Sequence, residues 1–116
     1  MTVLKLRILF DHAMFGPGKA ELLQRIAEAG SISAAGRQMG MSYKRAWMLV
    51  EEMNAAFREP LVTSARGGAG GGGAHLTEAG EEVLRRYRAV MEAAAAAAAD
   101  DLGALEAMLR PVAPSA

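Results

Sequence analysis

Short hydroxyl and basic side chains are concentrated in one stretch of the sequence, GSISAAGRQMGMSYKRAW, residues 30–47. Proteins use such groups to contact phosphate oxygens and base edges, and the free backbone amides at the start of a helix are further phosphate donors. Three serines stand where helices are expected to begin, and a basic pair closely follows the last of them: Ser31, Ser33 and Ser42, then Lys44 and Arg45. This chemistry suits contact with a nucleic acid.

The charge distribution agrees with that interpretation, although the total charge does not. The 116-residue chain has a formal net charge of zero, which by itself disfavours a nucleic-acid partner. Residues 31–50, however, hold three basic residues and no acidic one, whereas residues 77–116 hold seven acids and four bases. The segregation leaves one locally basic segment.

The elements around this segment have the pattern of a helix-turn-helix. Apolar residues at helical spacing predict a first helix over residues 18–29, with Gly30 at its end. A short helix from Ser31 or Ser33 to about Met39 follows, then a turn at Gly40, then a longer helix over residues 42–57. Two helices joined by a tight glycine turn can place the second in a DNA major groove. The alternative is a structural helical hairpin with an ordinary solvated basic face.

Trp47 has two interpretations. In the longer helix the core stripe is expected to be Ala46, Val50, Met53 and Phe57, and Trp47 lies one position beyond Ala46. A half-buried tryptophan at the edge of the core and a tryptophan that contacts nucleic acid both fit this position.

The flanking segments predict a small amount of sheet and a long helix. Alternating residues 3–10 predict a strand that needs a partner elsewhere, and LVTSAR and AHLT predict two short strands around the glycine run RGGAGGGGAH, residues 66–75. Thr77 and early glutamates predict a helix start. Further along, a three-four seam typical of helix pairing comprises Leu84, Tyr87, Met91, Ala94 and Ala98. Asp100 and Asp101 are expected to cap a separate last turn, and the tail over residues 111–116 to be disordered.

The sequence does not support an enzyme or a metal site. The glycine run lacks the lysine and hydroxyl residue of a phosphate-binding loop, and the chain has no cysteine and only two widely separated histidines. No carboxylate pair or nucleophile signature stands out. Without an apolar run long enough for a membrane span, and without cysteine, we expect a soluble cytoplasmic protein.

In their order along the chain, GSISAA, MSYKRAW and LTEAG strongly resemble the N-terminal winged-helix DNA-binding domain of ModE-type, molybdate-responsive regulators, and more distantly the LysR-type domain. The resemblance covers about residues 4–92. It implies a mainly α fold with a small β-sheet: a winged helix-turn-helix domain over residues 1–76, followed by a C-terminal dimerisation helix or helices over residues 77–110.

The resemblance also implies roles for individual residues. The helix over residues 42–57 is then the recognition helix, the glycine run is the wing, and the seam of the last long helix pairs with a second copy. The implied DNA-binding residues are Ser31, Ser33, Arg37, Ser42, Tyr43, Lys44, Arg45, Trp47, Met48, Arg66 and His75.

The sequence contains no counterpart of the C-terminal molybdate-binding region of longer family members, so we expect a stand-alone short form without a cofactor. The expected function is a dimeric, sequence-specific transcriptional regulator that binds a roughly palindromic operator in double-stranded DNA. The alternative is a winged-helix adaptor that binds proteins and not DNA.

Overall fold

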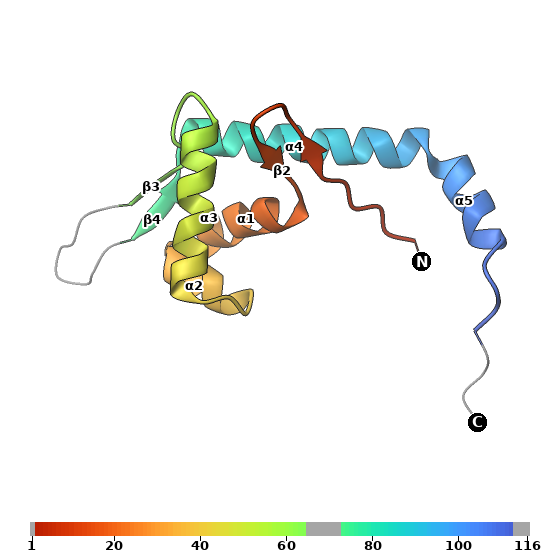
Figure 1. Cartoon of the computed structure of the whole chain (residues 1–116), viewed down its shortest axis with the longest axis horizontal. Coiled ribbons are helices and arrows are strands. Elements are labelled where there is room, and N and C mark those ends of the chain that lie inside the picture. The colour runs from red at the N-terminus through yellow and green to blue at the C-terminus, as the bar shows by residue number, and fades with distance from the viewer. Residues whose placement is uncertain (1, 65–72, 113–116) are drawn as a thin grey trace.

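The computed structural model describes residues 2–64 and 73–112. Within these ranges, five helices and two small antiparallel sheets make up the fold (Figure 1). In chain order the elements are β1 (Ile8–Leu9), β2 (Met14–Phe15), α1 (Pro17–Ala29), α2 (Ile32–Gln38), α3 (Tyr43–Ala56), β3 (Val62–Ser64), β4 (Ala74–Leu76), α4 (Glu78–Ala97) and α5 (Ala99–Ala107). The predicted class, mainly α with a small β component, is confirmed.

Helix α1 is the central helix of the core. Proline at its start needs no backbone N–H partner, and Gly30 ends it with φ of 71°, a left-handed conformation that glycine adopts without strain. Its inward side chains Leu22, Leu23 and Ile26 are fully buried. The predicted helix and its glycine end are both confirmed.

Serines begin the next two helices, as the sequence predicted. The Ser31 hydroxyl accepts a hydrogen bond from the Ala34 amide, and the Ser42 hydroxyl accepts one from the Arg45 amide, each at 3.1 Å. Such caps satisfy amides that the first turn of a helix leaves without a partner. Gly40, with φ of 72°, makes the turn between α2 and α3.

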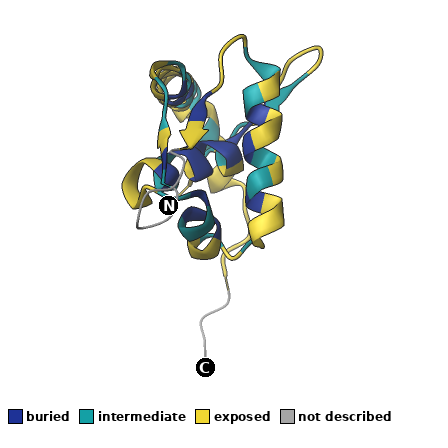
Figure 2. Ribbon diagram, turned by 90° about the vertical axis from the view of Figure 1, so that its left-hand side faces the viewer, coloured by how far each residue is buried: buried dark blue, intermediate teal, exposed yellow. Residues whose placement is uncertain are grey.

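The helix-turn-helix is closely packed at one glycine. A Cβ atom added to Gly36 would lie 2.8 Å from the Cβ of Ala46, so α2 and α3 approach closely here because Gly36 has no side chain. Ala46, Val50 and Met53 are buried, as the predicted core stripe requires, and Phe57 is half-buried. The buried residues lie where the helices face one another, and the outer faces of the helices are exposed (Figure 2).

The first half of α4 belongs to this same core. Leu84 and Tyr87 are 6% and 7% exposed, and the Tyr87 ring meets the Phe15 ring edge to face with centroids 5.2 Å apart. The Tyr87 hydroxyl donates a 2.6 Å hydrogen bond to the Leu6 carbonyl, and burial raises the pKa of this phenol above its ordinary value. Tyr87 thus fastens the N-terminal segment to α4.

The N-terminal strand is much shorter than the alternation over residues 3–10 predicted. Only Ile8–Leu9 pair, and their partner is the nearby Met14–Phe15 in an antiparallel hairpin. Leu4, Leu6 and Ile8 are half-buried while Lys5 and Arg7 are exposed, so the alternation describes burial as far as Ile8; Phe10, also expected on the inward side, is 50% exposed. The preceding residues do not form strand because the short β2 offers no further partner.

The last helices meet at a break. Ala98 ends α4 and begins α5, and no side-chain cap is present, so the prediction that Asp100 and Asp101 cap the last helix is wrong. These aspartates lie instead in the first turn of α5, where they face the positive end of its dipole. Beyond the body of the molecule, α4 projects as a single helix and α5 turns away from it (Figure 1). In the parts of the chain that the structure describes, no helix combines the length and apolarity needed to cross a bilayer.

Candidate nucleic-acid interface

The start of α3 presents most of the predicted contact residues to solvent. Tyr43 is 63% exposed and Met48 is 50% exposed, and Ser42, Lys44 and Arg45 are also exposed. No acidic residue lies among them, since the first acid of α3 is Glu51. The helix therefore offers one hydroxyl-rich, basic turn at its free end.

Beside that turn lies a small cleft of about 260 Å³. Its lining comes from the start of α2, the start of α3 and the two strands β3 and β4: Ser31, Ile32, Ser33, Tyr43, Trp47, Ser64, Gly73 and Ala74. Four of the predicted residues, Ser31, Ser33, Tyr43 and Trp47, therefore meet here. Ser64 is not among the residues predicted from the sequence, because only the pairing of β3 with β4 brings it to this place.

Trp47 is half-buried, and its ring also lines the cleft. It meets the Tyr43 ring edge to face, with centroids 6.1 Å apart. Its indole nitrogen is buried and has no hydrogen-bond partner among the described residues. The residue thus belongs to the edge of the core and to the candidate surface together, so the two interpretations of Trp47 are compatible.

The remaining predicted contacts lie outside the cleft. Arg37 is exposed in the last turn of α2. His75 is exposed on β4, where a ring nitrogen lies 3.0 Å from the Thr63 hydroxyl directly opposite on β3. Arg66 falls outside the described residues.

Two sets of hydrogen bonds fix the β3–β4 ribbon against the helices. The Ala74 amide donates to the Gly30 carbonyl at 2.8 Å, which ties β4 to the junction of α1 and α2. On the other side, Asn54 of α3 accepts bonds from the amides of Leu61 and Val62 at 2.8 and 3.1 Å, and its own amide donates to the Val62 carbonyl at 3.1 Å. The ribbon is therefore held beside both helices of the helix-turn-helix.

Thr77 completes this frame at the start of α4. Its hydroxyl caps the helix by accepting from the Gly80 amide at 3.0 Å, and it donates to the Pro60 carbonyl at 2.6 Å. A Cβ atom on Gly80 would lie 2.1 Å from the Leu61 carbonyl oxygen, so only glycine lets α4 start this close to β3.

The predicted dimerisation seam divides into two parts. Leu84 and Tyr87 are buried within the chain's own core, so they are not available to a second copy in this fold. Met91 is half-buried and packs against the same core, whereas Ala94 and Ala98 are half-buried further along, toward the end of α4. A helix pair would have to use these and the exposed residues beside them.

One protein-family model matches the segment that contains the helix-turn-helix and the β3–β4 ribbon. A family model described as "Bacterial regulatory helix-turn-helix protein, lysR family" matches residues 18–81, which run from α1 into α4.

Several curated proteins are similar over part of the chain. The molybdenum-pterin-binding protein MopB of Rhodobacter capsulatus is 49% identical over 69 residues, which are 60% of this chain and 26% of MopB. The DNA-binding transcriptional dual regulator ModE of Escherichia coli K12 is 40% identical over 65 residues, 56% of this chain and 25% of ModE. The chain thus matches about a quarter of the length of these relatives.

Among solved structures, the chain is similar to one in the crystal structure of a CbnR_DBD–DNA complex. The TM-score is 0.59 at 22% identity, over 76% of this chain and 95% of that one, which supports the fold. The helix-turn-helix, the ribbon beside it and the family match lead to one conclusion. The chain belongs to the lysR family of bacterial regulatory helix-turn-helix proteins, and its winged helix-turn-helix is of the ModE type.

Proposed function

We propose that this protein is a cytoplasmic, sequence-specific transcriptional regulator that binds double-stranded DNA as a homodimer. The observation that carries the proposal is the exposed, acid-free start of α3 beside a hydroxyl-lined cleft. In this proposal the first turns of α3 enter the major groove, where Lys44 and Arg45 contact bases or phosphates.

The ribbon and the start of α2 contribute to the same contact. Ser31 and Ser33 lie at the cleft with Ser64, and their hydroxyls suit phosphate oxygens. The segment between β3 and β4, with Arg66 and His75, serves as the wing against the neighbouring backbone. Residues 1–76 form the DNA-binding part and residues 77–110 the dimerisation part, with the first half of α4 joining the two.

The descriptions of two similar proteins support this proposal. E. coli ModE is a DNA-binding transcriptional dual regulator by name, and the similar solved chain was crystallised in a complex with DNA. A dimer with two copies of α3 about one DNA turn apart predicts a roughly palindromic operator with half-sites about 10 base pairs apart.

Selection from a random duplex pool, followed by gel shifts over a salt series, tests the proposal. We expect an inverted repeat, and an affinity that falls steeply with salt because each neutralised phosphate releases counterions. The second candidate, a protein-binding adaptor, is favoured only by the zero net charge of the chain. It predicts no enriched sequence and no salt-dependent binding, and that result would refute DNA recognition.

A further inference from the structure

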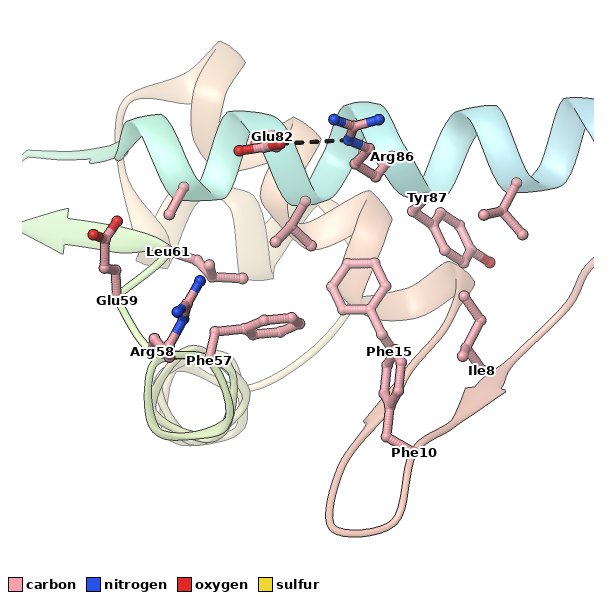
Figure 3. A pocket seen from close by; sticks show the side chains of 13 residues that line it. Ile8, Phe10, Phe15, Phe57, Arg58, Glu59, Leu61, Glu82, Arg86 and Tyr87 are labelled. Atoms are coloured by element: carbon pink, nitrogen blue, oxygen red, sulfur yellow. Dashed lines mark hydrogen bonds and ion pairs between the residues drawn. The ribbon is translucent and has the colours of Figure 1, made fainter.

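A second surface, far from the cleft, is an open groove of about 880 Å³. It lies between α4, the end of α3 and the β1–β2 hairpin (Figure 3). Four aromatic rings, those of Phe10, Phe15, Phe57 and Tyr87, face it together with Val83 and Val90. We call this surface the aromatic groove.

The aromatic groove is apolar and partly open to solvent. Phe10 is 50% exposed and Val90 is 46% exposed, although both are large hydrophobic side chains. Contiguous exposed apolar surface of this kind marks a binding site in soluble proteins. Its rim carries charges of both signs: Glu82 and Arg86 form an ion pair on α4, and Arg58 and Glu59 follow the end of α3 (Figure 3).

The same chain contains a segment whose large apolar side chains are exposed, although its Glu106 accepts a hydrogen bond from the Thr2 hydroxyl. Helix α5 has no buried residue; its Leu105 is 61% exposed, and Met108 and Leu109, just after its end, are 80% and 71% exposed. A nine-residue helix is marginally stable in water unless its apolar face packs on something. We propose that α5 of a second copy occupies the aromatic groove, and that each copy fills the groove of the other.

Size and spacing fit this occupant. The wall of the groove from Ala79 to Val90 is about 16 Å long, and α5 is about 13 Å long. Leu102 and Leu105 follow the i, i+3 spacing by which an amphipathic helix anchors in a groove, and Leu109 lies two residues beyond the end of α5. These leucines also match the volume of an aromatic-lined groove better than the alanines of α4 would.

The occupant comes from another copy because of where α5 starts. It begins at the far end of α4, nine residues beyond Val90, and it turns away from the axis of α4 (Figure 1). Reaching its own groove would require residues 91–97 of α4 to unfold. A reciprocal exchange instead gives a closed, two-fold contact. This inference rests on the proposed homodimer and names the surfaces that join it.

Cysteine cross-linking tests the contact, since the chain has no cysteine of its own. Val90→Cys is mixed with a size-tagged Leu105→Cys protein and oxidised, and we expect a mixed disulfide dimer. The control mixture pairs Val90→Cys with tagged Arg37→Cys, an exposed site on α2, and should give none. Absence of the mixed dimer, or an internal disulfide in a monomeric Val90→Cys/Leu105→Cys double variant, would overturn the proposal.

A second measurement separates this inference from the proposed function. Leu105→Asp with Leu109→Asp should convert the dimer to a monomer in light scattering, with no loss of the folded body because neither residue is buried. Ala104→Asp with Ala107→Asp adds the same charge to the opposite face of α5 and should leave the dimer intact. If the leucine variant stays dimeric, the proposed groove contact is wrong, while the proposed homodimer is still supported. If the unmodified chain is monomeric, both the groove contact and the homodimer are refuted.

Discussion

The amide of Ala74 lies 2.8 Å from the carbonyl of Gly30 and donates a hydrogen bond to it. This bond joins the second strand of the ribbon to the glycine that ends α1, immediately before the serine that begins α2. Both partners are main-chain groups, so no side-chain substitution removes them directly. The ribbon is thereby fixed beside the start of α2, where the candidate cleft forms.

The basic pair at the start of α3 is expected to carry DNA affinity. Lys44→Ala with Arg45→Ala should abolish specific operator binding. The remaining non-specific binding should have a salt slope smaller by about 2, because each lost phosphate contact removes roughly one released counterion. Both residues are exposed, so the circular dichroism spectrum and thermal unfolding should be unchanged. Lys5→Ala with Arg7→Ala removes the same charge from exposed positions of the N-terminal segment and should bind normally. Unaltered binding by the first variant would place the recognition surface elsewhere.

Gly36 is expected to tolerate no side chain. Gly36→Ala places a methyl group 2.8 Å from the Ala46 Cβ, so α2 and α3 must separate, at a cost of about 1–2 kcal/mol in the free energy of unfolding. Thermal unfolding measures this as a lower Tm. Gly18→Ala is the matched control, because a Cβ atom there meets nothing within 4 Å. Equal Tm values for the two variants would contradict the close approach.

Asn54 is expected to be a strong stability determinant although it binds no ligand. Asn54→Ala removes three hydrogen bonds and leaves part-buried main-chain groups without partners, which should cost about 2–3 kcal/mol in denaturant unfolding. Asn54→Asp keeps the accepting oxygen and loses only the donor, so its loss should be smaller. If the two variants are equally destabilised, the accepted bonds contribute little.

Tyr87 predicts an alkaline limit to stability. Because burial raises the pKa of its phenol in the folded chain, the protonated form stabilises the fold below the ordinary pKa of about 10, and this contribution is lost as pH rises through the folded pKa. At neutral pH the free energy of unfolding of Tyr87→Phe should be about 1 kcal/mol below that of the parent, because the variant lacks the hydrogen bond to Leu6. As pH rises above about 10, the stability of Tyr87→Phe should fall less than that of the parent. Tyr43→Phe, at an exposed site, serves as the control. Parallel pH profiles for the parent and Tyr87→Phe would refute this assignment.

Local signals in the sequence were sufficient for the helices. Gly30, Ser31, Gly40 and Ser42 stop or start helices by their own chemistry, and the structure uses each as predicted. The strand over residues 3–10 was predicted too long because pairing depends on a partner, and the partner hairpin arm is only Met14–Phe15. Alternation reports burial directly and strand pairing only indirectly.

Contacts between segments far apart in the sequence could not be predicted from the spacing of residues. The seam on α4 was correctly identified as apolar, but Leu84 and Tyr87 pack against the chain's own core, and a helical repeat does not specify which partner it meets. Asn54 was missed because an asparagine inside a helical pattern resembles any solvated residue until the β3 main chain lies beside it. The aromatic groove was missed for the same reason, since its rings come from three separate segments, the β1–β2 hairpin, the end of α3 and α4.

The run of seven alanines over residues 93–99 affects the direction in which α5 side chains point, as well as the length of the helical segment. Each residue of a helix turns the chain by about 100°, so a run of six alanines would point the leucines of α5 to a different side of the molecule. The composition of the run would hardly change, yet the leucines would no longer face the same way. The number of alanines therefore determines the direction in which the leucines of α5 point. It thereby determines the side from which α5 can contact a neighbouring molecule.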